Sequence, residues 1–304
     1  MTDVIIPTYK PDRELLDILD MLGKQTVKPE HIIIMNTEER YLADLLKNES
    51  YSPAGNVKIY NIAKEEFDHG ATRAAGVMHS DADIFICMTQ DAVPADEDFV
   101  KNLTAPLKDD IAVSYARQLP KAGSGIAERT AREFNYPDKS CVKGPDDVER
   151  LGIKAFFCSN VSCAYRRDIY DRLGGFIKKT IFNEDMIYAC GAVKAGYSIA
   201  YAADARVYHS HDYSAGEQFR RNIDLGLSQA EHPEVFEGLS SEAEGKKLVI
   251  KTIKAMARGG EILHIPGYIW TTGCRYAGYL IGKNHKRIPM GYIKKHSSNP
   301  GYFE

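Results

Sequence analysis

The sequence lacks the features of several protein classes. None of its apolar runs approaches the ~18–20 residues that a membrane-spanning helix needs. Residues 1–7 show neither a basic flank nor a long apolar stretch, so we expect no signal peptide. The six cysteines are scattered without a CxxC pair, which argues against a zinc site and favours reduced thiols in a cytosolic protein. Neither GxGxxG nor GxxxxGK[ST] occurs, so a dinucleotide-binding fold and a P-loop NTPase have no support.

The net charge is also small, but it is the sum of an acidic part and a basic part of the chain. The total of −3 over 304 residues argues against a dedicated nucleic-acid binder. Residues 246–304 nevertheless hold eleven Lys and Arg against two acidic residues, a net of +9, so the rest carries −12. With 44% hydrophobic and 27% charged residues, the composition is that of an ordinary globular protein of one or two domains.

Short apolar runs alternate with helix-length segments in the first half of the chain. Leucines at helical spacing predict a helix over about 15–22, and a small-residue stripe predicts another over 70–79. Buried strands are predicted at 4–7, 31–35, 57–61 and 84–88. This alternation predicts an α/β fold with a mostly parallel sheet flanked by helices.

The second half departs from this rhythm. Residues 120–152 are rich in Lys, Gly, Asp and Pro and predict a long, partly mobile connection. The pattern then predicts a strand at 155–164, helices at 168–173 and 184–195 around a glycine turn, and short strands at 197–201 and 206–209. From about 214 the pattern is helical throughout. We therefore expect a catalytic domain over 1–213 and a C-terminal helical extension over 214–304.

Polar residues follow the predicted strands, where open α/β sheets bind their ligands. They are Thr8 and Tyr9 after the first strand, Asn36 after the second and Gln90 with Asp91 after the fourth. A carboxylate such as Asp91 can hold a divalent cation against a diphosphate. The alternative is a turn residue that bonds its own backbone or caps the next helix.

Two further candidates lie at predicted helix starts. Arg73 follows the start of the 70–79 helix, where free N–H groups and a guanidinium suit a phosphate, although Asp68 could be a simple N-cap and Arg73 a surface residue. Glu184 and Asp185 open another helix. The helix dipole alone can explain them, whereas the functional interpretation is a general base.

Histidines and the C-terminal segment also allow two interpretations. His209 and His211 could face one side of a strand and contact a metal or phosphate, or they could be surface residues.

The last 59 residues interleave aromatic, aliphatic and basic residues, a pattern suited to a helix lying on an anionic membrane. The alternatives are a helix packed on the catalytic domain and a homodimer interface.

Taken in order along residues 1–213, these motifs resemble the inverting glycosyltransferases of family 2, which have the GT-A fold. The series is most similar to the bacterial rhamnosyltransferase branch. The motifs that carry the resemblance are Val4-Ile5-Ile6-Pro7-Thr8-Tyr9, Phe67-Asp68-His69-Gly70-x-Thr72-Arg73, Thr89-Gln90-Asp91-Ala92-x-Pro94, Ala116-Arg117-Gln118-x-Pro120, Tyr165-Arg166-Arg167, Gly174-Gly175-Phe176, Glu184-Asp185 and Val207-Tyr208-His209-Ser210-His211.

The resemblance implies a nucleotide diphosphate-sugar donor and a role for each matching residue. Pro7, Thr8, Tyr9 and Asn36 would line the base and ribose, with Gln90 also on the donor side and Arg73 near the diphosphate. Asp91 with His209 or His211 would bind Mg²⁺ or Mn²⁺, and Asp185 would be the catalytic base. Asn160 and Glu184 would lie on the acceptor side. Two positions depart from the family: Asn36 replaces a frequent Asp, and Thr89 replaces the first acid of the Asp-x-Asp metal motif.

The resemblance therefore leads us to expect an enzyme that transfers a sugar to a glycan or lipid-linked acceptor during bacterial polysaccharide assembly. L-Rhamnose from dTDP-rhamnose is the expected donor, and a UDP-hexose is the alternative. A non-catalytic GT-A scaffold and a metal-dependent hydrolase are the rival classes. We expect no nucleic-acid partner, and a cytoplasmic location with peripheral contact at the inner face of the cell membrane through the C-terminal segment.

Overall fold

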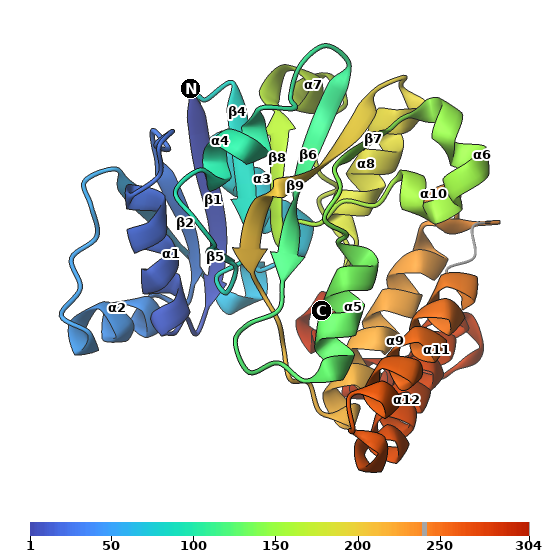
Figure 1. Cartoon of the computed structure of the whole chain (residues 1–304). Helices are drawn as coiled ribbons and strands as arrows, with labels where there is room; N and C mark the ends of the chain where they lie inside the picture. Colours follow the sequence, from blue (N-terminus) through green and yellow to red (C-terminus); the bar gives the residue numbers. More distant parts are fainter. Residues whose placement is uncertain (239–241, 304) are drawn as a thin grey trace. The chain divides into compact units, whose positions relative to one another are not determined.

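The computed structural model describes residues 1–238 and 242–303, and these form two compact units (Figure 1). The first unit consists of Met1–Leu119, Tyr136–Lys179 and Glu184–His209. The second consists of Pro120–Asn135, Thr180–Asn183 and Ser210–Glu304. Its last stretch begins close to the expected start of the helical extension, and two short stretches from earlier in the chain join it. Glu304, one of the two C-terminal acids, lies outside the described residues.

A nine-stranded sheet forms the centre of the first unit within the described residues. Its strands are β1 (Thr2–Tyr9), β2 (Ile32–Thr37), β3 (Val57–Ile62), β4 (Ile84–Met88), β5 (Val93–Pro94), β6 (Ile111–Leu119), β7 (Cys141–Lys143), β8 (Ser162–Arg166) and β9 (Ser198–Tyr208). The order is β3-β2-β1-β4-β8-β6-β9-β5, and β7 pairs with β9. The first four strands are mutually parallel, as are β6 and β9, whereas β8 runs antiparallel between β4 and β6.

Helices cover this sheet, which confirms the predicted α/β class with a mostly parallel sheet. They are α1 (Arg13–Gly23), α2 (Glu39–Asn48), η1 (Lys64–Glu66), α3 (His69–Met78), α4 (Phe99–Thr104), η2 (Pro145–Asp147), α6 (Val148–Leu151), η3 (Gly152–Ala155), α7 (Arg167–Arg172) and α8 (Glu184–Lys194). The four N-terminal strands and the first and third helices fall close to their predicted positions, because each is a local apolar pattern with a clear stop.

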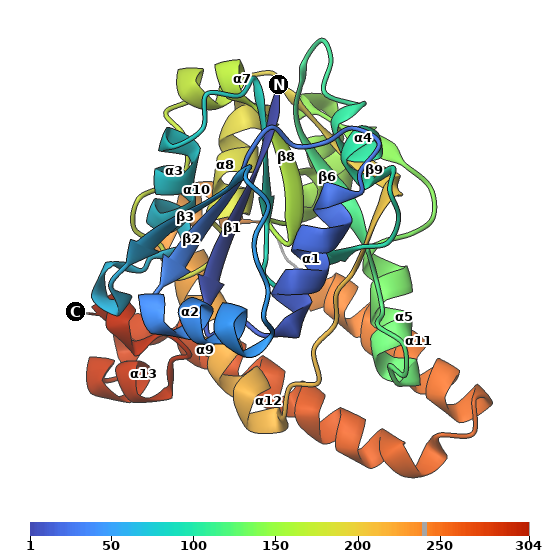
Figure 2. The same ribbon diagram turned by 90° about the vertical axis from the view of Figure 1, so that its left-hand side faces the viewer.

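The two faces of the sheet are covered by different helices, with α1 and α3 on opposite sides of β1 (Figure 2). Successive strand residues point to opposite faces, so Val4 and Ile6 pack in one core with the leucines of α1 and with α4. Ile5 points the other way, toward α3. There Gly76 has no side chain, and a Cβ at this position would collide with Ile5. This close approach fixes the height of α3 above the sheet.

The second unit is helical. Its elements are α5 (Ile126–Asn135), α9 (Ala215–Glu231), α10 (Pro233–Phe236), α11 (Glu242–Arg258), η4 (Ile262–His264), α12 (Ile265–Lys283), η5 (His285–Arg287), α13 (Met290–His296) and η6 (Pro300–Phe303). Helix α12 lies directly on α9 because glycines line the contact. A Cβ at Gly226, Gly278 or Gly282 would strike the backbone of the facing helix. The long helices therefore pack backbone to backbone, and α5 packs against α11.

Three predictions from the second half of the chain are wrong in detail. Residues 120–152 are not an irregular connection, because they contain α5, β7 and α6. The strand predicted at 155–164 begins only at Ser162, since the backbone N–H of Asn160 bonds a side chain instead of a neighbouring strand. The two short strands at 197–201 and 206–209 are one continuous strand, β9, whose register with β6 shifts between Ala116 and Arg117.

Candidate active site

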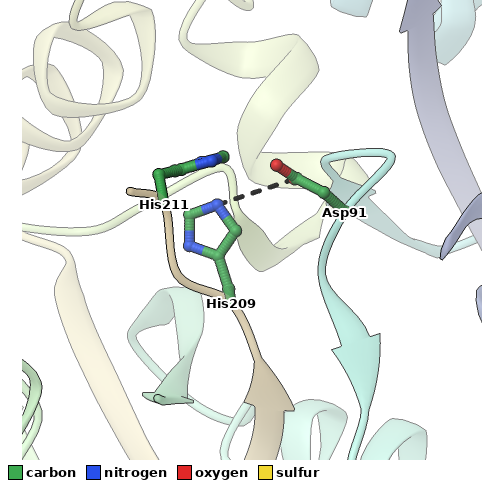
Figure 3. A group of neighbouring side chains, drawn as sticks. All are labelled: Asp91, His209 and His211. Atoms are coloured by element: carbon green, nitrogen blue, oxygen red, sulfur yellow. Dashed lines mark ion pairs between the residues drawn. The ribbon is translucent and has the colours of Figure 1, made fainter. Parts of the chain in front are cut away.

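Asp91 and His209 come together at one edge of the sheet. Asp91 lies between β4 and β5, and His209 directly follows β9. The antiparallel pairing of β5 with β9, in which Val93 faces Tyr208, brings them together. His209 Nε2 lies 3.6 Å from Asp91 Oδ1. One ligand atom each from Asp91, His209 and His211 falls within 4.8 Å of the others (Figure 3). This spacing suits three ligands of a single metal ion.

The donor set indicates which metals this group fits. One carboxylate and two imidazoles form a mixed oxygen and nitrogen set, which suits a divalent metal ion. Thr89, two residues before Asp91, has a buried hydroxyl without a hydrogen-bond partner among the described residues. An unsatisfied buried hydroxyl is costly, so a ligand at this edge would offset that cost.

Gln118 fixes the orientation of the His209 ring. Its side-chain nitrogen donates to the hydroxyl of Tyr136 at 2.7 Å and to Ser159 Oγ at 3.2 Å. Its side-chain oxygen therefore faces His209 Nδ1, at 3.0 Å. An amide oxygen can only accept, so Nδ1 carries a proton, and Nε2 is the ring nitrogen that faces Asp91. The resemblance includes Gln118 in a motif but gives it no role, so this contact was not predicted.

Asp185 is held by two backbone N–H groups at the start of α8. Its Oδ2 accepts from Asn160 N at 2.9 Å, and its Oδ1 accepts from Met186 N at 2.7 Å. Burial, and then the negative charge of neighbouring Glu184, raise the pKa of Asp185 to about 7. A carboxyl group with this pKa can accept a proton near neutral pH, which is what a general base requires.

Glu184 points away from solvent into a buried ion pair. Its Oε1 lies 3.0 Å from Arg73 Nη1 and accepts from Asn160 Nδ2 at 3.0 Å. Burial is the largest influence and favours the neutral acid, but the positive charges of Arg73 and His69 and the hydrogen bond from Asn160 together outweigh it, so the pKa of Glu184 is lowered. Asn160 is held in turn by the hydroxyl of Tyr165, which donates to its Oδ1 at 2.7 Å. Arg73, expected near a diphosphate, is buried against Glu184.

Residues 159–161 connect these groups. Ser159 contacts Gln118, and Asn160 contacts both acids of α8. The carbonyl of Val161 accepts from the backbone N–H of Thr89. Residues 159–161 therefore contact the candidate base directly. They reach the metal-ligand candidates through Gln118, which bonds His209, and through Thr89, two residues before Asp91.

The expected nucleotide residues form a second hydrogen-bonded group at the ends of β1 and β2. Thr8 lies opposite Asn36 in the parallel register and donates to its side-chain oxygen at 3.0 Å. The Asn36 amide donates to Asn61 at 2.8 Å. Gln90 bonds both backbone polar groups of Tyr9, at 2.8 and 3.0 Å, and so fixes the end of β1 just after Pro7. The contact with Asn61, at the facing position of β3, was not predicted.

Comparison with known proteins identifies the family. Residues 3–174 match Glycosyl transferase family 2. The chain is 36% identical to the O-antigen chain rhamnosyltransferase RfbN of Salmonella typhimurium, over 99% of this chain and 95% of that protein. It is 31% identical to the O-antigen chain rhamnosyltransferase WbaN of Salmonella anatum, with the same coverage.

Solved structures share the fold at low sequence identity. The mannosyltransferase PcManGT from Pyrobaculum calidifontis, in complex with GDP-Man and Mn²⁺, superposes with a TM-score of 0.58 at 14% identity, covering 92% of this chain and 86% of that one. S. aureus TarS 1-349 in complex with UDP-GlcNAc gives a TM-score of 0.51 at 14% identity, covering 94% and 91%. The matched family region and the full-length relatives agree, and the chain belongs to glycosyltransferase family 2.

Proposed function

We propose that this glycosyltransferase transfers L-rhamnose from dTDP-rhamnose to an acceptor hydroxyl, with inversion at the anomeric carbon, during O-antigen-type polysaccharide assembly. The two relatives named as O-antigen rhamnosyltransferases support the sugar and the process. The observation that carries the chemistry is the carboxylate of Asp185, held by two N–H groups and with its pKa raised to about 7. These features suit a base that deprotonates an acceptor.

Asp185 acts first in this reaction. Its carboxylate removes the proton from the acceptor hydroxyl as that oxygen attacks the anomeric carbon from the face opposite the leaving nucleoside diphosphate. The N–H groups of Asn160 and Met186 hold both carboxylate oxygens, so the base keeps one orientation while it accepts the proton. General-base assistance of this kind contributes about 10²- to 10⁴-fold to the rate.

Asp91 and His209, with His211 beside them, would hold Mn²⁺ or Mg²⁺. When bound, the ion supplies positive charge that stabilises the departing diphosphate. Gln118 presents His209 Nε2 for coordination by accepting a hydrogen bond from Nδ1–H. Thr89 replaces the first acid of the usual motif, so the site carries one negative charge fewer than that motif would give it.

The buried contacts of Arg73, Glu184 and Asn160 favour positioning roles. Arg73 and Glu184 neutralise one another, and Asn160 bonds Glu184 as well as the base. We therefore assign Arg73 to the orientation of Asp185 through Glu184 and Asn160, in place of the expected diphosphate contact. Glu184 and Asn160, expected on the acceptor side, receive the same positioning role.

The donor base and ribose are assigned to the group formed by Pro7, Thr8, Tyr9, Asn36 and Gln90. The hydrogen bonds within this group hold the ends of β1 and β2 in place, where the donor would bind. The buried hydroxyl of Thr37, at the end of β2, has no partner among the described residues and offers a further contact. A lipid-linked glycan is the proposed acceptor, which would place the enzyme at the cytoplasmic face of the membrane.

A donor screen tests this proposal. Thermal stability and donor hydrolysis are measured with dTDP-rhamnose, UDP-glucose, UDP-galactose and GDP-mannose, each with Mn²⁺ and with EDTA. Because a ligand stabilises the state that binds it, the melting temperature should rise most with dTDP-rhamnose and Mn²⁺. A preferential response to a UDP sugar would contradict the rhamnose assignment, and binding without any turnover of donor would indicate a non-catalytic scaffold.

A further inference from the structure

The turn between α11 and α12 exposes an unusual number of large apolar side chains. Leu263 is 92% exposed and Trp270 69%, and Ile262 and Ile269 are more than half exposed. All four lie within nine residues, in η4 and the first part of α12. Figure 2 shows this turn at one end of the helical group formed by α9, α11 and α12. Contiguous exposed apolar residues mark an interaction surface, whereas single ones need no explanation.

Exposed basic residues lie on α11, the helix that leads into this apolar turn. Lys251, Lys254 and Arg258 are exposed and recur at spacings of three and four residues, so they share one face of the helix, with Ile250 next to them. Lys251 also lies 5.6 Å from the centre of the Phe134 ring on α5. Acidic residues are scarce in the same stretch of sequence, since α12 contains none and Glu261 is the one acid between Lys246 and Phe303. The segment from α11 to α12 therefore carries both exposed apolar and exposed cationic side chains.

A groove adjoins this surface. It has a volume of about 670 Å³ and runs among α9, α11 and α12. Tyr268, Ile269 and Tyr276 line one side and Leu248 the other, with Lys246 and Arg275 also in the lining. Apolar walls with cations at the same site suit a molecule that has a hydrocarbon part and an anionic part.

We infer that this docking surface, formed by residues 246–276 of α11, η4 and α12, binds an anionic lipid bilayer. Leu263, Trp270 and Ile262 enter the interfacial region, and the cations of α11 lie against lipid phosphates. Apolar insertion combined with electrostatic attraction gives stable peripheral binding, which either contribution alone seldom provides. Among the described residues no helix is both long and apolar enough to cross a bilayer, so the surface would lie on the membrane.

Charge complementarity favours a membrane over the other partners. A nucleic acid would be bound by the cations but would gain little from exposed Leu and Ile side chains. A second copy of the chain would bury the apolar turn but would bring equally cationic surfaces together. An anionic bilayer satisfies both kinds of group at once.

The single tryptophan of the chain makes the proposal directly measurable. Trp270 is the chain's one Trp, so its fluorescence reports only on this surface. The full chain is mixed with vesicles of phosphatidylcholine containing roughly one-third phosphatidylglycerol, and with pure phosphatidylcholine. We expect co-sedimentation and a shift of the emission to shorter wavelength with the anionic vesicles, and much weaker binding to the neutral ones.

Variants separate the two contributions. Lys251→Gln, Lys254→Gln and Arg258→Gln together should weaken binding about 100-fold, since each cation near an anionic surface contributes roughly fivefold. Ile262→Ser with Leu263→Ser should weaken it by about tenfold or more. Lys24→Gln, Lys28→Gln and Lys58→Gln, on exposed residues of the first unit, serve as the charge control and should leave binding unchanged. Met78→Ser, at an 81% exposed residue, is the apolar control.

Four results would overturn the inference. The chain could stay in the supernatant with anionic vesicles, or bind them without a change in Trp270 emission. It could form a dimer that shields Trp270 without lipid, which would assign the surface to a second copy. The cations could bind a single-stranded oligonucleotide while vesicle binding is absent, which would assign it to nucleic acid. Donor binding is measured in parallel, and because it does not use this surface, failure of the transfer proposal and failure of the membrane proposal remain distinguishable.

Discussion

Replacing Arg73 by Met tests the buried ion pair beside the candidate base. Arg73 and Glu184 are each about 5% exposed, and their charged atoms lie 3.0 Å apart. Met fills a similar volume but leaves the Glu184 carboxylate buried without its cation. Breaking a buried pair in this way costs about 3–5 kcal/mol, a large share of the ~5–15 kcal/mol that stabilises a typical domain.

Chemical unfolding in urea measures this cost. The exposed pair formed by Arg13 and Glu49, at 2.6 Å, is the matched control, and Arg13→Met should change the free energy of unfolding by about 1 kcal/mol or less. If Arg73→Met does not fold, the double variant Arg73→Met/Glu184→Gln removes the orphaned charge and should recover much of the loss. A change below about 1 kcal/mol in Arg73→Met would refute the reasoning.

The double variant also distinguishes the two possible roles of Arg73, positioning of the base and binding of the donor diphosphate. A positioning role predicts slower transfer with nearly unchanged donor affinity in the double variant, whereas a diphosphate contact predicts weaker donor binding.

The pH dependence of stability gives a second check on the ion pair between Arg73 and Glu184. The pKa of Glu184 is lowered in the folded state, so the pair stabilises the protein at neutral pH and this contribution is lost as the pH falls below about 4.3 and through the folded-state pKa. Arg73→Met should flatten that acid-side loss.

Three further predictions concern the site. The transfer rate should rise with pH and level off above about 7 as Asp185 loses its proton, and Glu184→Gln should move the midpoint to lower pH because it removes a negative charge; a flat pH–rate profile would contradict the assignment of the base. Gln118→Leu should weaken Mn²⁺ binding about 10- to 100-fold by calorimetry, and ¹⁵N NMR should show that His209 no longer favours the Nδ1-protonated tautomer; unchanged affinity and tautomer would refute the positioning role. EDTA should abolish transfer and Mn²⁺ should restore it, and Asp91→Asn should lose that response; activity that persists in EDTA would exclude the metal role.

The elements that could be predicted from the sequence are those whose signal is local. The strands at 4–7 and 84–88 are continuous apolar runs, and the first helix ends at a glycine. The approach of Asp91 to His209 was also expected, because both follow strands and the resemblance assigns them to one metal site.

The remaining features depend on contacts between distant parts of the chain. Helix α5 packs against α11, which lies more than a hundred residues later, so the composition around 120–152 suggested a loop. Arg73 and Glu184 are 111 residues apart, and each alone has a plausible surface role. The contact of Gln118 with His209 depends on β6 lying beside β9, which the pattern of single strands does not specify.

The central claim is that Asp185 is the base of a sugar-transfer reaction, and Asp185→Asn tests it most directly. Asn keeps the shape of the side chain and its oxygen can still accept one of the two N–H bonds, but it cannot take the acceptor proton. Transfer from dTDP-rhamnose and donor affinity are measured on the same preparation. The proposed mechanism predicts a rate lower by about 10²-fold or more with donor affinity retained. Transfer at close to the wild-type rate would contradict it.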